Sequence, residues 1–125
     1  MRMRTLRAVP LLACLLAAPA ASEPWACRFT AACPAAGPCA EAVLELRVIA
    51  ADHAGDLFAS TGSGDRPLSR LTAPGAVPAG YAGANGGGTA RMLTISGART
   101  AVLTVHGVDG GTSAVTHFGT CEELS

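Results

Sequence analysis

The alternation of apolar and polar residues is clearest near the C-terminal end, where it predicts three neighbouring strands. They cover residues 91–96, 100–106 and 113–119. Short alternating runs bounded by turn residues are typical of an antiparallel meander. A three-residue loop at 97–99 would place Leu93 opposite Leu103, and a tight turn at 109–110 would place Leu103 opposite Thr116. This register predicts one largely apolar face across the three strands.

Two further strands are expected earlier in the chain. Trp25, Cys27 and Phe29 alternate with smaller or polar residues, which indicates an opening strand with one buried face. Residues 41–49 also alternate and predict a second strand. This segment contains good helix formers, so a helix is the alternative.

The middle of the chain is less regular. A short strand is expected over residues 56–61, with either Leu57 or Phe58 facing inward, and another over 66–71. A loop is expected over 31–40. The segment 72–90 holds two prolines and six glycines without a period, so it is predicted to be a glycine-rich surface loop. Tyr81 is the candidate binding residue within it.

The pattern as a whole predicts one all-β domain. We expect a small antiparallel barrel or sandwich of about 6–7 short strands that ends in the meander and is stabilised by disulfides.

The first twenty residues have the features of a signal peptide. Three arginines in residues 1–7 precede an apolar run over 8–18 and a small-residue cleavage motif at 18–20. We expect cleavage after Ala20, with Ser22 as the alternative, and a mature domain over 21–125. The run is too short to span a bilayer, so no transmembrane segment is expected after cleavage. A lipoprotein acylated at Cys14 is the other interpretation.

Removal of the signal peptide changes the charge balance. Six arginines and nine carboxylates remain, a net charge of −3, and the chain has no lysine. A mildly acidic domain does not have the basic surface that nucleic acids or anionic membranes require, so no nucleic-acid partner is expected.

Four cysteines remain in the mature chain, an even number that indicates two disulfides in an oxidising compartment. Of the three possible pairings we favour Cys27–Cys121 and Cys33–Cys39. On the chain-entropy model these bridges contribute roughly 4.7 and 2.4 kcal/mol. A zinc site is not expected, because the spacing of these cysteines does not match that of zinc ligands.

The sequence contains no recognisable catalytic motif. The candidate catalytic groups are His53, His106 and His117, and no spacing connects them. In the expected register, His106 and His117 lie on the face away from the core and too far apart to share a metal ion. The glycines at 86–88 lack the residues of a nucleotide-binding loop. We therefore expect neither a metal nor a cofactor, and name no catalytic residue.

Part of the chain resembles a known family. Ser63-Gly64-Asp65-Arg66, the strands around Ile95 and Leu103, the turn at Asp109-Gly110 and the final cysteine follow the order seen in periplasmic C-type lysozyme inhibitors, which are small disulfide-tied β-barrels. The resemblance implies a barrel, with Ser63 and Arg66 as contact residues. Pro67 stands where the family has an aromatic residue.

These observations predict an exported, non-enzymatic binding or envelope-associated module in the periplasm or outside the cell, with a protein or envelope component as its partner. The alternatives are a lysozyme-inhibitor-like protein and a small hydrolase that uses a histidine.

Overall fold

The computed structural model describes residues 23–50, 56–85, 88–107 and 113–124. The strands in these ranges are β1 (Trp25–Pro34), β2 (Ala40–Ala50), β3 (Leu57–Thr61), β4 (Gly64–Arg70), β5 (Ala79–Asn85), β6 (Thr89–Ile95), β7 (Thr100–Gly107) and β8 (Ser113–Glu123). The predicted signal peptide, Cys14 and His53 lie outside the described residues.

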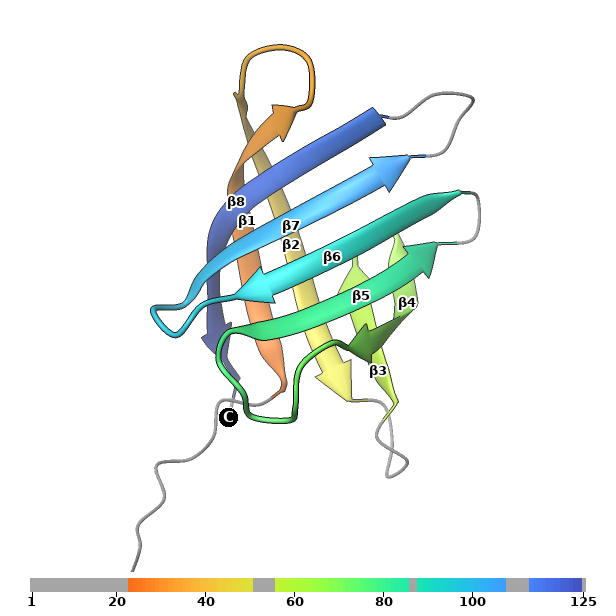
Figure 1. Ribbon diagram of the computed structural model, residues 1–125, viewed down its shortest axis with the longest axis vertical. Helices are drawn as coiled ribbons and strands as arrows, with labels where there is room; N and C mark the ends of the chain where they lie inside the picture. The colour runs from red at the N-terminus through yellow and green to blue at the C-terminus, as the bar shows by residue number, and fades with distance from the viewer. Residues whose placement is uncertain (1–22, 51–55, 86–87, 108–112, 125) are drawn as a thin grey trace, which may run out of the picture.

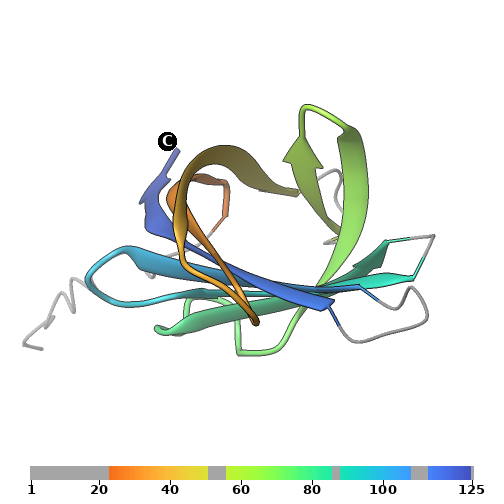
Figure 2. The same ribbon diagram turned by 90° about the horizontal axis from the view of Figure 1, so that it is seen from above.

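The strands form a closed antiparallel barrel in simple sequence order. Each strand pairs with the next, and β8 pairs with β1 to complete the ring. Figures 1 and 2 show β5 to β8 as the flatter wall and β1 to β4 as the curved wall opposite. The predicted all-β barrel is confirmed, with eight described strands instead of six or seven. The described residues contain no helix with the length and apolarity that a membrane span requires.

The core fills one end of the barrel. Inward-facing residues of β1, β2, β6 and β7 are almost completely buried there, including Trp25, Val48 and Ile95, each 0% exposed. Toward the other end, the inward-facing Leu44, Leu68 and Val105 pack against this core but are only partly buried. We call these the packed end and the open end.

The structure also decides between the two predictions for residues 41–49. They belong to strand β2, so the strand prediction is correct and the helix alternative is wrong.

Both expected disulfides are present, Cys27–Cys121 and Cys33–Cys39. The first joins two directly paired residues of β1 and β8, so it lies across the junction that closes the ring. The second connects the end of β1 to the segment before β2. Because β1 continues to Pro34 and β2 begins at Ala40, the loop expected over 31–40 is shorter than predicted.

The expected meander register is correct in its first half and wrong in its second. Leu93 lies opposite Leu103 as predicted. On β8, however, Leu103 lies opposite His117 and not Thr116. A shift of one residue reverses which side chains face inward. His117 therefore faces the interior, contrary to the prediction, while Phe118 is 45% exposed on the outside.

The segment 72–90 is not one long loop, because it contains the whole of β5. Strand β5 pairs with β6 over its full length, with Tyr81 opposite Leu93. The strand consists mainly of alanine and glycine, so its inward and outward positions hardly differ in hydropathy. The period-2 signal that identifies a half-buried strand is therefore absent from the sequence.

Candidate functional site

The structure does not bring the three predicted binding residues together on one surface. Ser63 is exposed on the turn between β3 and β4. Arg66 lies opposite the buried Ala59, which places it at an inward-facing position of β4. Tyr81 is only 3% exposed and belongs to the core at the packed end. Tyr81 therefore lies on β5 in the core and not in a surface loop.

Tyr81 belongs to a hydrogen-bonded chain at the packed end. The Trp25 indole donates to the Tyr81 hydroxyl oxygen (Nε1–Oη 3.1 Å), and this hydroxyl donates to Glu23 (Oη–Oε1 2.6 Å). Arg70 donates to both carboxylate oxygens of Glu23, at 3.0 and 2.7 Å. We call Glu23, Trp25, Arg70 and Tyr81 the clamp. It connects Glu23, two residues before β1, to β4 and β5.

The electrostatics of the clamp favour an ionised Glu23. Burial raises the pKa of this carboxyl, but the hydrogen bonds from Arg70 and Tyr81 outweigh burial and leave the pKa below its ordinary value. Burial, together with the Glu23 charge, raises the pKa of Tyr81 well above its ordinary value. Tyr81 therefore stays a neutral donor, which is the state that the hydrogen bond to Glu23 requires.

Arg99 covers the same end of the barrel. Its guanidinium carbon lies 5.1 Å from the centroid of the Trp25 ring, and its Nη1 pairs with Glu123 at 2.7 Å. The residue adopts a left-handed backbone (φ 71°), and its carbonyl accepts a hydrogen bond from the amide of Cys121. The contacts with Trp25, Glu123 and Cys121 stabilise the left-handed backbone conformation of Arg99, which is unfavourable for a residue other than glycine. Arg99 therefore also has a structural role.

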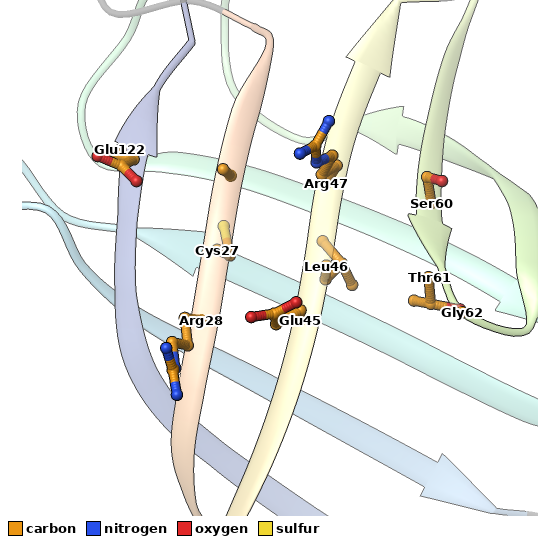
Figure 3. Close-up of a pocket in the computed structure, with 10 residues that line it drawn as sticks. Cys27, Arg28, Glu45, Leu46, Arg47, Ser60, Thr61, Gly62 and Glu122 are labelled. Carbon is orange, nitrogen blue, oxygen red and sulfur yellow. The ribbon is translucent and has the colours of Figure 1, made fainter.

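A hollow lies on the outer wall of the barrel (Figure 3). It is a groove of about 410 Å³ that crosses β8, β1, β2 and the β3–β4 turn. Its lining residues are Ala26, Cys27, Arg28, Glu45, Leu46, Arg47, Ser60, Thr61, Gly62 and Glu122. We call it the outer groove.

Strand pairing explains both the shape and the charge of the outer groove. Glu122, Ala26, Arg47 and Ser60 form one row across four strands, and they alternate with buried residues such as Cys27. In this row the small side chain of Ala26 lies between the two long charged side chains of Glu122 and Arg47, and all three residues line the groove.

The groove carries charges of both signs. Arg28 and Arg47 lie next to Glu45 on β1 and β2, and Glu122 lies on β8 (Figure 3). Among the described residues, the ion pairs are Arg70–Glu23 and Arg99–Glu123, and neither involves the groove. The groove charges are exposed and thus available to a ligand with complementary charges.

Sequence reasoning did not find this groove, although part of the signal was present. Arg28, Glu45 and Arg47 are the outward residues of the two strands that were predicted. The pairing of these strands in the observed register makes Arg28 and Glu45 direct neighbours. That register includes a bulge between Phe29 and Ala31, and no residue pattern in the sequence predicts this bulge. Ser63 directly follows Gly62, which is one of the residues that line the groove.

The histidines do not form a site within the described residues. His106 is exposed on β7, while His117 lies inside the barrel with its ring edge against Phe29, 6.2 Å between ring centroids. Burial lowers the pKa of His117. In the part of the chain that the structure describes, no group of three or more histidine, cysteine or acidic residues is arranged to hold a metal ion.

Comparison of the chain with protein-family models, curated proteins and solved structures finds no match.

Proposed function

We propose that this protein is an exported, non-enzymatic binding module whose outer groove holds a charged segment of a partner protein. The observation that carries the proposal is the set of four exposed charges in one groove, two of each sign and without ion pairs among them. Charges arranged in this way select a partner by complementarity and orient it on approach.

The closed barrel limits how a partner can bind. Every described strand has a paired neighbour on both sides, and the shortest ladder, between β4 and β5, consists of two residue pairs. The ring therefore leaves little free strand edge in the described residues for an extended peptide to join, and we expect recognition to come mainly from side chains on the wall and from the turns. The outer groove offers both, because outward side chains of β8, β1 and β2 meet the β3–β4 turn there.

Export is supported by the cysteines. Two disulfides persist in oxidising compartments and are rare in the cytosol. The predicted signal peptide agrees with this location. Cys27 is one of the residues that line the groove, and its disulfide to Cys121 joins β1 to β8. The bridge therefore holds together two of the strands that carry the groove charges.

A photo-crosslinking residue at position 26, which lines the groove, tests the proposal in the cells that produce the protein. The same residue at position 92 is the control, since Met92 is 48% exposed on β6. We expect a discrete protein adduct from position 26 and none of that mass from position 92. Adding Arg47→Glu should abolish the adduct, and Arg47→Lys should keep it. Equal adducts from both positions, or no effect of Arg47→Glu, would contradict the proposal.

A lysozyme-inhibitor function is the second candidate, because a disulfide-tied closed barrel is the fold that the family resemblance implies. It is tested by adding the purified protein to a lysozyme assay. Inhibition that is lost in Ser63→Ala would support it. Full lysozyme activity at tens of micromolar protein would reject it.

A further inference from the structure

The outer face of the flatter wall carries two neighbouring rows of uncharged side chains. The rows cross β6, β7 and β8 and consist of Thr94, Val102 and Phe118 in one row, and Met92, Thr104 and Thr116 in the other. These residues alternate along their strands with buried ones such as Leu93 and Leu103, so they point away from the core. We call the six residues the flat face, since they lie on the flatter wall (Figures 1 and 2).

The flat face exposes its large apolar side chains as a cluster. Met92 is 48% exposed, Val102 36% and Phe118 45%. Val102 and Phe118 are direct partners across β7 and β8, and Met92 belongs to the adjacent row. Single exposed apolar residues are common on soluble proteins, whereas a contiguous patch of them marks a contact surface.

The apolar surface continues over β5. Gly80 on β5 pairs with Thr94, and a Cβ at Gly80 would lie 3.5 Å from Cβ of Leu71. Leu71 follows β4 and is 53% exposed. It therefore adds a fourth large apolar side chain beside the flat face, and the apolar surface spans the whole width of the flatter wall.

The flat face can lose water at little cost in hydrogen bonds. The hydroxyl of Thr104 already has an acceptor within the sheet, the carbonyl oxygen of Met92 (Oγ1–O 3.4 Å). A polar group is costly to bury only when it has no hydrogen-bond partner. Covering the flat face would thus leave this hydroxyl satisfied.

The distribution of charge points to a second copy of the chain as the occupant. The outward positions of β1, β2 and β4 carry charged residues, among them Arg28, Glu45, Arg47 and Asp65. A charged partner would lose the hydration of its charges on the flat face and gain no ion pair there. A second copy brings the same uncharged surface, so two copies can stack without like charges meeting, although the expected mature chain has six arginines and nine carboxylates.

The size of the flatter wall sets the strength of such an interface. Strands β5 and β6 have 7 residues each, β7 has 8 and β8 has 11. At about 4.8 Å between strands and about 3.3 Å per residue, four strands of seven residues outline roughly 440 Å². Two such faces together give roughly 900 Å², which is at the weak end of specific protein interfaces.

We propose that the flat face is the interface of a weak homodimer, in which two copies stack through their flatter walls about a twofold axis. The same residues of both copies then face each other, as in other twofold interfaces. Methionine and aromatic residues at the centre, with charges depleted, are typical of homodimer interfaces. The residues that line the outer groove are different ones, so each copy keeps its groove accessible and the inference does not depend on the proposed function.

Sedimentation velocity of the purified protein, from about 5 to 500 µM, tests the dimer. We expect monomers at the low end and dimers at the high end, with a Kd of about 10–100 µM. Because the flat face is uncharged, raising the salt concentration from about 0.05 to 0.5 M should not weaken the dimer. A monomer throughout the concentration range, or a dimer that dissociates at high salt, would overturn the proposal.

Phe118→Glu and Val102→Glu should each raise the Kd at least about tenfold, since each buries an unpaired charge from both copies. Val43→Glu is the matched control, because Val43 is 65% exposed on β2 and the change adds the same charge. Thermal unfolding verifies that the variants are folded. A dimer that Phe118→Glu leaves unaffected, or that Val43→Glu weakens equally, would place the interface elsewhere and reject the proposal.

A photo-crosslinking residue at position 92 tests the flat face without adding a charge. In the purified protein at high concentration, we expect a covalent dimer from position 92 and none from position 43. The adduct expected from position 26 contains a different protein, so failure of one proposal is distinguishable from failure of the other. Monomeric protein that sediments with phosphatidylcholine vesicles, and loses this binding in Phe118→Glu, would assign the flat face to a lipid surface and overturn the homodimer.

Discussion

Glu23 shows how one carboxylate can stabilise an end of a β-barrel. Its side chain is only 6% exposed, and it accepts hydrogen bonds from Arg70 and Tyr81. A buried charge is costly without such partners. The clamp satisfies Glu23 and at the same time orients the Trp25 indole through Tyr81. Polar residues at this end therefore position the largest apolar side chain of the core.

Tyr81→Phe tests the clamp. The change removes one hydroxyl, leaves the indole of Trp25 without its acceptor and removes a donor to Glu23. We expect the free energy of unfolding to fall by about 2 kcal/mol, because buried polar groups lose their partners. Urea unfolding at pH 7 measures this. An unchanged midpoint would show that the clamp contributes nothing to stability.

His117 predicts a pH dependence of stability. Burial lowers its pKa in the folded state, so the unfolded chain takes up a proton at higher pH than the folded barrel does. The free energy of unfolding should therefore fall as the pH decreases through the unfolded value of 6.5 and toward the lower folded pKa. The melting temperature of the protein at pH 7.5 and at pH 5.5 measures this loss.

His117→Gln should remove most of that loss between the two pH values. His106→Gln should retain it, because His106 is exposed on the outer face of β7. An equal loss of melting temperature in the unaltered protein and in His117→Gln would assign the pH dependence to other groups.

At the scale of the elements, β1 and β8 approach each other very closely at Gly119. A side chain at Gly119 would collide with the carbonyl oxygen of Arg28 and would lie 2.6 Å from Cα of Phe29. The bulge between Phe29 and Ala31 is next to this point. Glycine is therefore required at 119 for the two strands to approach each other.

Gly119→Ala should destabilise the barrel by about 1–3 kcal/mol, since the added methyl group must push β1 and β8 apart. Gly97→Ala is the control, because a Cβ at Gly97 meets nothing within 4 Å. Chemical unfolding of both variants compares them. Equal stability of the two would show that β1 and β8 can separate without cost.

The elements also show which predictions the sequence could support. Alternation identified β1, β2, β6 and β7, because their inward side chains are large and apolar. It did not identify β5, in which the inward positions at Ala79 and Gly83 carry small side chains or none. Secondary structure built on backbone pairing with little side-chain contrast has no period to detect.

The correct register of β8 can be predicted from the sequence if the expected disulfide is taken into account. A disulfide between Cys27 and Cys121 requires both side chains to lie on the same side of neighbouring strands. Cys27 alternates with Trp25 and was expected to face inward, so Cys121 and the other odd-numbered residues of β8 had to face inward too. His117 follows from this rule and Thr116 does not. The outer groove, in contrast, depends on the order of strands around the ring.

For the whole molecule, the two disulfides differ in what they constrain. Cys27–Cys121 spans 94 residues and crosses the closing junction, while Cys33–Cys39 spans 6 residues within one hairpin. On the chain-entropy model, replacing both cysteines of the first pair by alanine lowers the free energy of unfolding by about 4.7 kcal/mol, and of the second pair by about 2.4 kcal/mol. Urea unfolding of the two double variants measures both losses. A larger loss for the short bridge would contradict this ranking.

The closing junction also means that the two ends of the described barrel, at Pro24 and Leu124, are neighbours in space. The amide of Leu124 donates to the carbonyl of Pro24 at 2.9 Å, directly beside the β1–β8 ladder. A short linker between these two points would leave every strand pair in place. The chain could then be cut at the 97–99 turn to give a circular permutant with the same barrel, in which β8 and β1 are consecutive and the Cys27–Cys121 bridge is local. The same barrel architecture is thus compatible with chain termini at the β1–β8 junction or at the 97–99 turn.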